Sequence, residues 1–375
     1  MLFVLLDLHP QPEPSQQRVL ALLRALVQTE PFTPLLICRK NSLLADRAAA
    51  EGLPMLALGS SRPLHPVSLL RIWLRLRPHR RVILQSFGEQ AAVLANLLAA
   101  RRRPGRTIVL HTRFFTPGMR RPMLQKSYAA ADAIVCGSST IAKLVQQENE
   151  LPSDTFRIIP PGTKHSDYSE RMAQRNGRVA ICMPGALTEG HGQASLVHAM
   201  AALWQVEDLP PWEVRLAGTG PMFHFLLDEA QKLGVLDRLA ILGEQDMHDV
   251  LPHCKLLVLP PGELVYAPAL AGGWAVGLPV ICPALPAAIE LVRDGENALL
   301  VAPDNPQALA SAMLRIIRDA KLAEKLVQGG RNALASVSEE RMIADNFALC
   351  RELIASHTWV AGSSVPAQDV GAGQP

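Results

Sequence analysis

The sequence of 375 residues predicts an α/β fold with two doubly wound, parallel-sheet domains that face each other across a cleft. Its length exceeds what one hydrophobic core usually fills. Short, continuously apolar runs alternate with helical patterns in both halves, which is typical of parallel strands covered by helices on both faces. A polar segment interrupts this alternation once, near the middle. In such folds ligands bind at the carboxyl ends of the strands.

The first domain is predicted to span residues 1–165. Its strands are expected at 2–8, 32–39, 81–86, 107–112, 133–139 and 156–162, with helices at 16–28 and 90–102. The first apolar run is short and no basic residue precedes it, so it fits a buried strand better than a signal peptide or a membrane span. A Pro-Pro-Gly turn and the polar segment 166–178 then predict an interdomain linker.

The second domain is predicted to span residues 179–356. Its strands are expected at 178–185, 212–220, 239–244, 255–262 and 278–284, and its helices at 192–205, 221–233, 267–276, 306–318 and 340–356. The last of these helices closes the domain. The tail 357–375 is rich in Gly, Ser, Pro and Gln, a composition typical of disorder.

Composition narrows the class of protein. Six cysteines without any CxxC pair indicate buried, reduced thiols and a cytoplasmic location. Residues 1–170 carry a formal charge of +10 and the remainder −7, which favours an anion-rich partner for the first half. An anionic membrane fits better than nucleic acid, because basic and bulky apolar residues alternate over 68–81. Arg71, Trp73, Arg75 and Arg77 would lie on that membrane; a solvated helix face is the alternative.

Three segments of the second half have the form of ligand-binding loops. Residues 183–200 contain a strand end at Gly185 and a helix start, where main-chain amides can hold phosphate. In 216–230, Gly218 and Gly220 lack a third glycine in register, which argues against an NAD dehydrogenase. The stretch 262–280 opens with Glu263 and then forms a short helix and a buried strand. Each signal alone is weak.

Taken together and in order, these segments resemble the family-4 glycosyltransferases. The matching pieces are GALTEGHG, AGTGP, LGEQDMHDVLPHCKLLVLPPGE, AVGLPVI and AAIELVRDGENALLVAPDNPQALA, with HTRFF, AADAIVCGSS and RIIPPGT in the first half. The resemblance implies the GT-B fold, in which two Rossmann-like domains enclose the cleft. It also implies retaining, metal-independent transfer of a hexose-type sugar from a nucleotide-sugar donor, with no other cofactor.

The leading hypothesis is a transfer to a lipid-linked or cell-envelope glycan, in lipopolysaccharide or polysaccharide biosynthesis of a bacterium. The protein would be cytoplasmic and would dock peripherally at the inner face of the inner membrane. The expected catalytic residues are His111 and Glu263, and Arg113 can reach a phosphate. The donor is expected to contact Gly185, Thr188, His191, Gly218, Gly220, Tyr266 and Ala267. No motif for metal binding is visible.

The sequence departs from the family pattern at the donor site. The arginine position is Ala186, the lysine position is His191, and the second glutamate is replaced by Ala271 or Gly272, depending on alignment. The loop after the first strand has no glycine pair. These departures leave a second hypothesis open, a non-catalytic, degenerate member that binds or scaffolds. A sugar-nucleotide epimerase is a third alternative.

Overall fold

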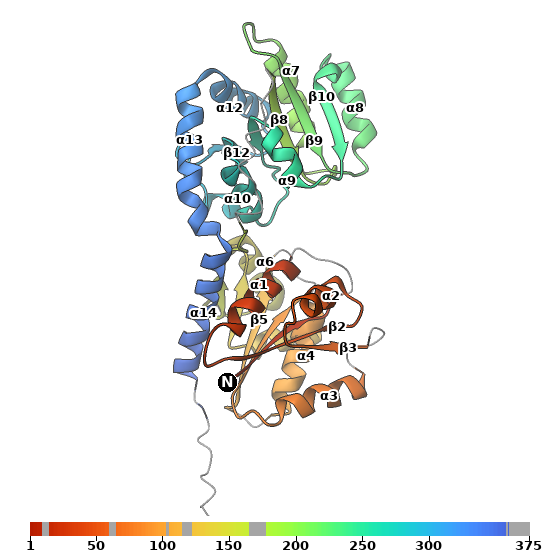
Figure 1. Ribbon diagram of the computed structural model, residues 1–375. Helices are drawn as coiled ribbons and strands as arrows, with labels where there is room; N and C mark the ends of the chain where they lie inside the picture. The colour runs from red at the N-terminus through yellow and green to blue at the C-terminus, as the bar shows by residue number, and fades with distance from the viewer. Residues whose placement is uncertain are drawn as a thin grey trace, which may run out of the picture.

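The computed structural model describes residues 1–9, 15–59, 65–102, 105–114, 122–164, 178–357 and 359, and these form two α/β lobes (Figure 1). The predicted fold class is confirmed, since each lobe contains a parallel sheet of the doubly wound kind. The predicted linker and tail fall almost entirely outside the described residues. The domain boundaries therefore remain predictions.

The N-terminal lobe is built on a seven-stranded sheet with the order β3-β2-β1-β4-β5-β6-β7. Its strands are β1 (Leu2–Asp7), β2 (Thr33–Arg39), β3 (Met55–Leu58), β4 (Val82–Phe87), β5 (Thr107–Arg113), β6 (Ala133–Cys136) and β7 (Phe156–Ile158). All pairings between them are parallel. The short strand β3 was not predicted, because four residues give too little pattern to separate a strand from a loop.

Helices connect these strands, as parallel pairing requires. They are α1 (Ser15–Val27), α2 (Leu43–Ala50), α3 (Pro66–Leu76), α4 (Glu89–Ala100), α5 (Pro122–Ala129) and α6 (Ser139–Asn149). Local sequence fixes where some begin. The Ser42 and Ser138 hydroxyls accept hydrogen bonds from amides in the first turns of α2 and α6, which is the usual role of an N-cap serine.

The C-terminal lobe has a six-stranded parallel sheet with the order β10-β9-β8-β11-β12-β13. The strands are β8 (Val179–Pro184), β9 (Trp212–Ala217), β10 (Leu239–Gly243), β11 (Leu256–Val258), β12 (Val280–Pro283) and β13 (Leu299–Val301). The helices are α7 (Gln193–Trp204), α8 (Phe223–Lys232), α9 (Met247–Val250), α10 (Ala267–Ala275), α11 (Pro286–Ile289), α12 (Pro306–Arg318) and α13 (Ala320–Ala333). The strand order reverses between β8 and β11, so a ligand is expected where these two strands end.

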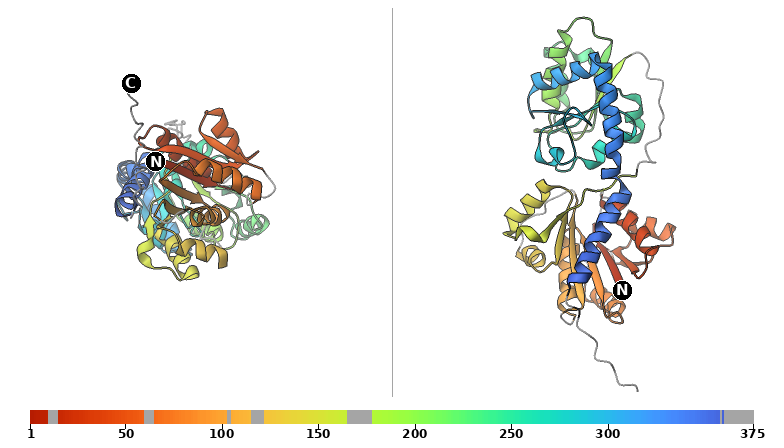
Figure 2. Two further views of the ribbon diagram at one scale, coloured as in Figure 1. Left: turned by 90° about the horizontal axis from the view of Figure 1, so that it is seen from below. Right: turned by 90° about the vertical axis from the view of Figure 1, so that its left-hand side faces the viewer.

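The last helix, α14 (Glu339–Ser356), leaves the C-terminal lobe and lies along the N-terminal one, as Figure 2 shows in its right-hand view. Met342, Leu349 and Cys350 share a buried cluster with residues of β1 and α1. The ring of Phe347 lies 6.3 Å from that of Phe32. The chain thus crosses between the lobes a second time.

The two segments of chain that run between the lobes, before α14 and after β7, are hydrogen-bonded to each other. The Thr163 amide donates to the Val337 carbonyl (3.0 Å), and the Glu339 amide donates to the Thr163 carbonyl (3.2 Å). A Cβ on Gly162 would lie 2.5 Å from the Glu339 Cα, so only glycine allows this approach. We call residues 161–164 and 337–339 the crossing pair. Further contacts join the lobes, including the Ser138 hydroxyl, which donates to the Leu264 carbonyl (2.7 Å).

Two further features of the structure are the state of the cysteines and the hydrophobicity of the helices, both of which the composition led us to predict. All six cysteines are buried and free, as predicted. Across the part of the chain that is described, we find no helix with the length and apolar character needed to cross a bilayer.

Candidate functional site

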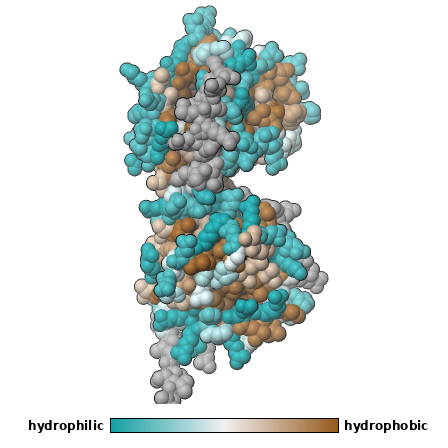
Figure 3. Space-filling model, in the orientation of Figure 1, coloured by the Kyte–Doolittle hydropathy of each residue, from teal (hydrophilic) through white to brown (hydrophobic). Residues whose placement is uncertain are grey.

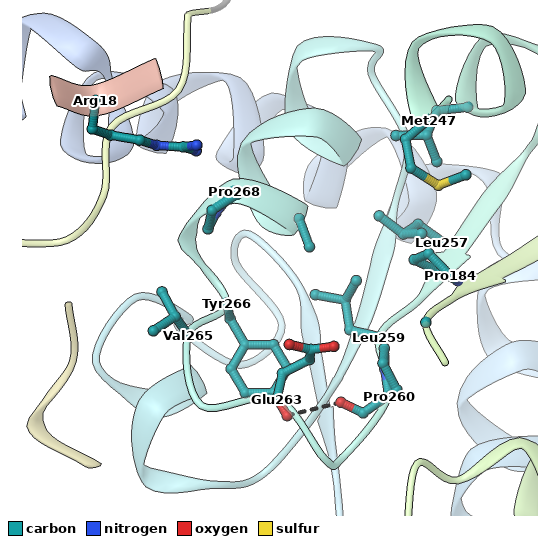
Figure 4. A pocket seen from close by; sticks show the side chains of 13 residues that line it. Arg18, Pro184, Met247, Leu257, Leu259, Pro260, Glu263, Val265, Tyr266 and Pro268 are labelled. Carbon is teal, nitrogen blue, oxygen red and sulfur yellow. Dashed lines mark hydrogen bonds between the residues drawn. The ribbon is translucent and has the colours of Figure 1, made fainter. Parts of the chain in front are cut away.

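A cavity of about 400 Å³ lies at the junction of the lobes, at the carboxyl ends of β8 and β11 (Figure 4). Its lining is mainly apolar and consists of Arg18, Pro184, Gly185, Met247, Leu251, Leu257, Leu259, Pro260, Glu263, Val265, Tyr266, Pro268 and Ala269. We call it the donor cavity, after the predicted donor-binding residues Gly185 and Tyr266 that line it. Its place is the point where the strand order of the C-terminal sheet reverses, which is where doubly wound folds bind ligands.

The loop that carries Glu263 is held in shape by Tyr266. This loop connects β11 to α10, and the buried Tyr266 hydroxyl donates a hydrogen bond to the Pro260 carbonyl (2.8 Å; Figure 4). This hydrogen bond joins the start of the loop, at Pro260, to its end, at Tyr266. The Glu263 side chain is therefore presented by a fixed turn of main chain rather than by a loose connection.

Glu263 is half-buried in this apolar surrounding. Burial raises the pKa of its carboxyl, because the charged form loses water, while the nearby His191 acts in the opposite direction. The His191 ring is oriented by Thr188, whose hydroxyl lies 2.7 Å from Nδ1. A Cβ on Gly262 would lie 2.9 Å from this ring, so His191 packs against the residue that precedes Glu263. The structure thus brings Thr188, His191 and Glu263 together.

Gly218 and Gly220 allow two loops to pack closely. A Cβ on Gly218 would lie 1.9 Å from the Gly185 carbonyl oxygen, and one on Gly220 would lie 2.3 Å from that of Leu187. The Gly185 amide donates to the Ala217 carbonyl (3.0 Å), and the Leu187 amide donates to the Thr219 carbonyl (2.9 Å). These two amides are therefore already hydrogen-bonded within the protein and are not open to a ligand. The two predicted glycines shape the site by supporting the loop after β8.

The start of α10 faces the same cavity. Pro268 and Ala269 lie in its first turn and line the cavity, next to the predicted residues Tyr266 and Ala267. The first amides of a helix have no partner within the helix and carry a partial positive charge; in α10 Ala267 and Ala269 supply such amides, whereas Pro268 has no N–H. This end of α10 is suited to an anionic group.

The positions of the absent second carboxylate lie inside the protein. Ala271 and Gly272 are both buried in the middle of α10. The next residue, Gly273, packs tightly, since a Cβ there would lie 2.6 Å from a methyl carbon of Leu257. Close packing thus explains the small residue at position 273.

His111 lies within the N-terminal lobe, only 1% exposed, and is not among the residues that line the donor cavity. Its Nε2 is 3.1 Å from the Ser127 carbonyl oxygen, which can only accept, so the proton is on Nε2. Its Nδ1 then accepts from the Ser86 hydroxyl at 2.7 Å. Burial lowers the pKa of His111 to about 4. The ring is held neutral between β4 and α5.

Arg113 is also buried, at the end of β5. Its Nε donates to the Tyr128 hydroxyl, and the guanidinium stacks 5.6 Å from the Tyr128 ring. The Glu89 carboxylate lies 3.9 Å from its Nη2. Arg113 is not among the residues of the donor cavity, so its predicted contact with a phosphate remains a prediction.

Arg18 is a cavity residue that the sequence did not single out. It extends from α1 of the N-terminal lobe, whereas the other side chains labelled in Figure 4 belong to the C-terminal lobe. The residue is 7% exposed, and its Nε donates to the Gly162 carbonyl in the crossing pair (3.1 Å). An arginine within the apolar pattern of 16–28 is the only signal that sequence offers for it.

No group of three or more His, Cys, Asp or Glu side chains within the described ranges is arranged to hold a metal ion. Metal independence remains a prediction.

Comparison with known proteins now identifies the two lobes. A model described as Glycosyltransferase Family 4 matches residues 15–167, and one described as Glycosyl transferases group 1 matches residues 166–333. Glycosyltransferase domains of the GT-B kind are present. The Anabaena protein Alr3699/HepE, solved in complex with UDP, superimposes with a TM-score of 0.75 over 94% of this chain and 100% of its own, at 14% sequence identity. At that identity the likeness concerns the fold.

Curated relatives align with part of the chain. An exopolysaccharide phosphotransferase of Streptomyces coelicolor, SCO2592, is 31% identical over 42% of this chain and 17% of its own length. The lipopolysaccharide core biosynthesis glycosyltransferase LpsE of Rhizobium meliloti is 27% identical over 58% of this chain and 63% of its own. The alignments thus cover less than two thirds of each relative. They support a glycosyltransferase role and leave the acceptor open.

Proposed function

We propose that this protein transfers a sugar from a nucleoside-diphosphate sugar to a lipid-linked or cell-envelope glycan. The observation that carries the proposal is the Glu263 carboxylate, half-buried in an apolar cavity beside the first turn of α10. A carboxylate in such a place can accept hydrogen bonds from sugar hydroxyls, while the helix start holds the diphosphate. The UDP in the Anabaena structure and the role of LpsE in lipopolysaccharide core biosynthesis support the donor and acceptor classes.

In the proposed reaction, the sugar–phosphate bond breaks and negative charge develops on the leaving diphosphate. The amides at the start of α10 stabilise that charge, and His191 assists when protonated. The transfer proceeds with retention and without a metal, and the departing phosphate helps to remove the proton from the acceptor hydroxyl. The protein then has to orient the sugar, a role we assign to Glu263. His111 acts by supporting the N-terminal wall of the cleft from within.

We further propose that α3 docks the protein on an anionic membrane. Its inner face buries Ser68, Ile72 and Leu76, whereas Val67, Leu70 and Leu74 on its outer side are 58%, 55% and 53% exposed. Trp73 is also exposed, and the Arg77 guanidinium lies 5.1 Å from its ring centre. Figure 3 shows hydrophobic surface at the end of the N-terminal lobe remote from the other lobe, where Figure 1 places α3. Arginines between exposed apolar residues suit a surface of anionic lipid.

Co-sedimentation with vesicles tests the membrane contact. Wild-type protein should bind phosphatidylcholine vesicles that contain phosphatidylglycerol, and Leu70→Ser with Leu74→Ser should release it. Val27→Ser is the matched control, because Val27 is 50% exposed on α1, away from α3. Equal binding by all variants would rule out α3 as the contact.

The second candidate is a non-catalytic glycosyltransferase-like subunit that binds or scaffolds. Ala186, His191 and the buried Ala271 favour it, because two cations and a carboxylate of the family pattern are absent. Charged hydrogen bonds contribute roughly 1.5–3 kcal/mol each, so these losses are substantial unless other groups offset them.

A thermal-shift panel of UDP-, GDP- and ADP-sugars separates the two candidates, since a ligand of the native state raises the melting temperature. One donor should stabilise the protein, Glu263→Ala should strongly reduce the shift, and Glu324→Ala on the exposed surface of α13 should preserve it. Hydrolysis or transfer of the sugar of that donor by purified protein would establish catalysis. Absence of any shift at millimolar donor would refute the transferase proposal and favour the scaffold.

A further inference from the structure

The two lobes also meet at the start of α6, through residues that do not belong to the crossing pair. Helix α6 lies at the edge of the N-terminal lobe that faces the other lobe (Figure 1). The residues at its start, Ser138 and Ser139, are hydrogen-bonded to two segments of the C-terminal lobe. One is the loop that carries Glu263, and the other is the end of the short helix α11. We call Ser138, Ser139, Leu264 and Glu290 the clasp.

One half of the clasp is a carboxylate from the C-terminal lobe. Glu290 follows α11, and its two oxygens lie 3.0 and 3.2 Å from the Ser139 amide nitrogen, which donates to them. The Ser139 hydroxyl donates to the same carboxylate. The first amides of a helix lack a partner within the helix and attract negative charge. The first turn of α6 has no acidic residue of its own, so Glu290 supplies this charge from the other lobe.

The other half of the clasp is Ser138, whose hydroxyl makes two hydrogen bonds with different roles. It accepts from the Ile141 amide (3.2 Å), which caps α6, and it donates to the Leu264 carbonyl in the other lobe (2.7 Å). A hydroxyl has a single proton to donate, and here that proton is given to Leu264. Ser138 is 2% exposed, so the bond is shielded from water. It holds the main chain directly after Glu263.

Apolar packing continues across the same boundary. Ile141 of α6 and Val265 of the Glu263 loop belong to one buried cluster, which therefore contains residues of both lobes. The loop is thus supported twice. The Tyr266 hydroxyl holds it from within the C-terminal lobe, and the Ser138 hydroxyl holds it from the N-terminal lobe.

We propose that the clasp holds the lobes together and positions Glu263 from across the lobe boundary. Ser138 is then a positioning residue, because it is not among the residues that line the donor cavity and acts through the Leu264 carbonyl. This inference rests on the proposed function, since it takes Glu263 as the residue that binds the donor sugar. Donor affinity thus depends on a serine of the lobe opposite to the one that carries Glu263. When the lobes part, the loop loses one of its two supports.

Distances between spin labels, measured by pulsed electron paramagnetic resonance, test whether the clasp holds the lobes. Lys143→Cys on α6 and Glu324→Cys on α13 give an exposed labelling position in each lobe, while the native cysteines are buried. The intact clasp should give one distance, and Ser138→Ala with Glu290→Ala should add a longer one. Ser42→Ala is the matched control. It removes the N-cap hydroxyl of α2, which accepts at the same 3.2 Å and bonds to residues of its own lobe.

Calorimetric titration with the donor found in the thermal-shift panel tests the positioning of Glu263. Ser138→Ala should raise the donor Kd by roughly two- to tenfold, the equivalent of one neutral hydrogen bond. Ser138→Thr keeps the hydroxyl and should restore wild-type affinity. Ser42→Ala loses a comparable N-cap and should lower the melting temperature to a similar extent, yet it should bind the donor as wild type does. This comparison separates positioning from a general loss of stability.

Three results would overturn the inference. Label distances in Ser138→Ala with Glu290→Ala that match those of the intact clasp would show that it does not hold the lobes. Parted lobes with an unchanged donor Kd would show that Glu263 does not depend on it. Weaker donor binding by Ser42→Ala, equal to that of Ser138→Ala, would assign the effect to stability alone. Failure of every nucleotide sugar to bind the wild type would instead refute the proposed function, and the label distances would still decide whether the clasp holds the lobes.

Discussion

The Glu263 carboxylate leads to a prediction in which one substitution has two opposite effects. Glu263→Gln keeps the shape of the side chain and removes its charge. In the proposed complex a sugar hydroxyl then donates to a neutral amide oxygen instead of a carboxylate. A charged hydrogen bond contributes roughly 1.5–3 kcal/mol and a neutral one about 1 kcal/mol. The difference, about 0.5–2 kcal/mol, corresponds to a donor Kd that rises between about twofold and about thirtyfold.

The same substitution should make the protein without ligand more stable at neutral pH. The pKa of Glu263 is raised by burial, so the folded state holds its proton more tightly than the unfolded state. Stability from the protonated form is therefore complete below the unfolded pKa and is lost as pH rises through the folded pKa. Above that range the wild type keeps a poorly hydrated charge in an apolar cavity. Glutamine has no such charge, and the variant should melt at a higher temperature.

Melting curves from pH 4 to pH 8 and calorimetric titration with the donor found in the thermal-shift panel measure both effects. The gain in melting temperature should grow as pH rises, and donor affinity should fall. Glu324→Gln, on the exposed surface of α13, should change neither quantity. A Glu263→Gln variant that melts below wild type at pH 8 and binds the donor equally well would refute this account of the site.

Three other substitutions test the supports of the site. Tyr266→Phe leaves the Pro260 carbonyl without its partner and should cost about 1 kcal/mol of unfolding free energy in urea titration, with a weaker donor affinity from a looser loop. Gly218→Ala places a methyl group 1.9 Å from the Gly185 carbonyl oxygen, so it should lower the melting temperature and abolish donor binding. Gly234→Ala is the control, because the added carbon meets nothing within 4 Å and the variant has only the cost of backbone strain. The pKa of His111 is lowered to about 4, so wild-type stability should fall by about 3 kcal/mol as pH drops from about 6.5 to 4. A His111→Gln variant should lack that slope.

Much of the fold follows from the order of apolar runs in the sequence. Continuous apolar strands such as β6 and β11 have no polar face and must be covered on both sides, which is typical of parallel sheets. The destination of α14 does not follow from such patterns. Its apolar positions indicate a buried face, but the lobe that buries it depends on where the chain turns after α13. Local sequence holds no information on that choice.

Sequence reasoning located part of the cavity lining where short loops at the carboxyl ends of strands form it. Glu263, Tyr266 and Gly185 lie along short segments between a strand and a helix, and the structure places all three on the donor cavity. His111 shows the limit of this reasoning. A histidine near the end of a strand has the same sequence pattern whether its ring faces the cleft or a neighbouring helix. Arg18 could not be found, because its position depends on how the two lobes meet.

The crossing pair has a consequence for how this molecule can move. Because these two segments are hydrogen-bonded to each other at one place, a rotation of the lobes about that place would keep the bonds, whereas sliding of one lobe along the other would break them. The Arg18 side chain, from the N-terminal lobe, donates a hydrogen bond to Gly162 in the crossing pair. Pro268 belongs to α10 of the C-terminal lobe. Rotation of the lobes about this place would separate Arg18 from Pro268 and would therefore change the width of the donor cavity, which both residues line.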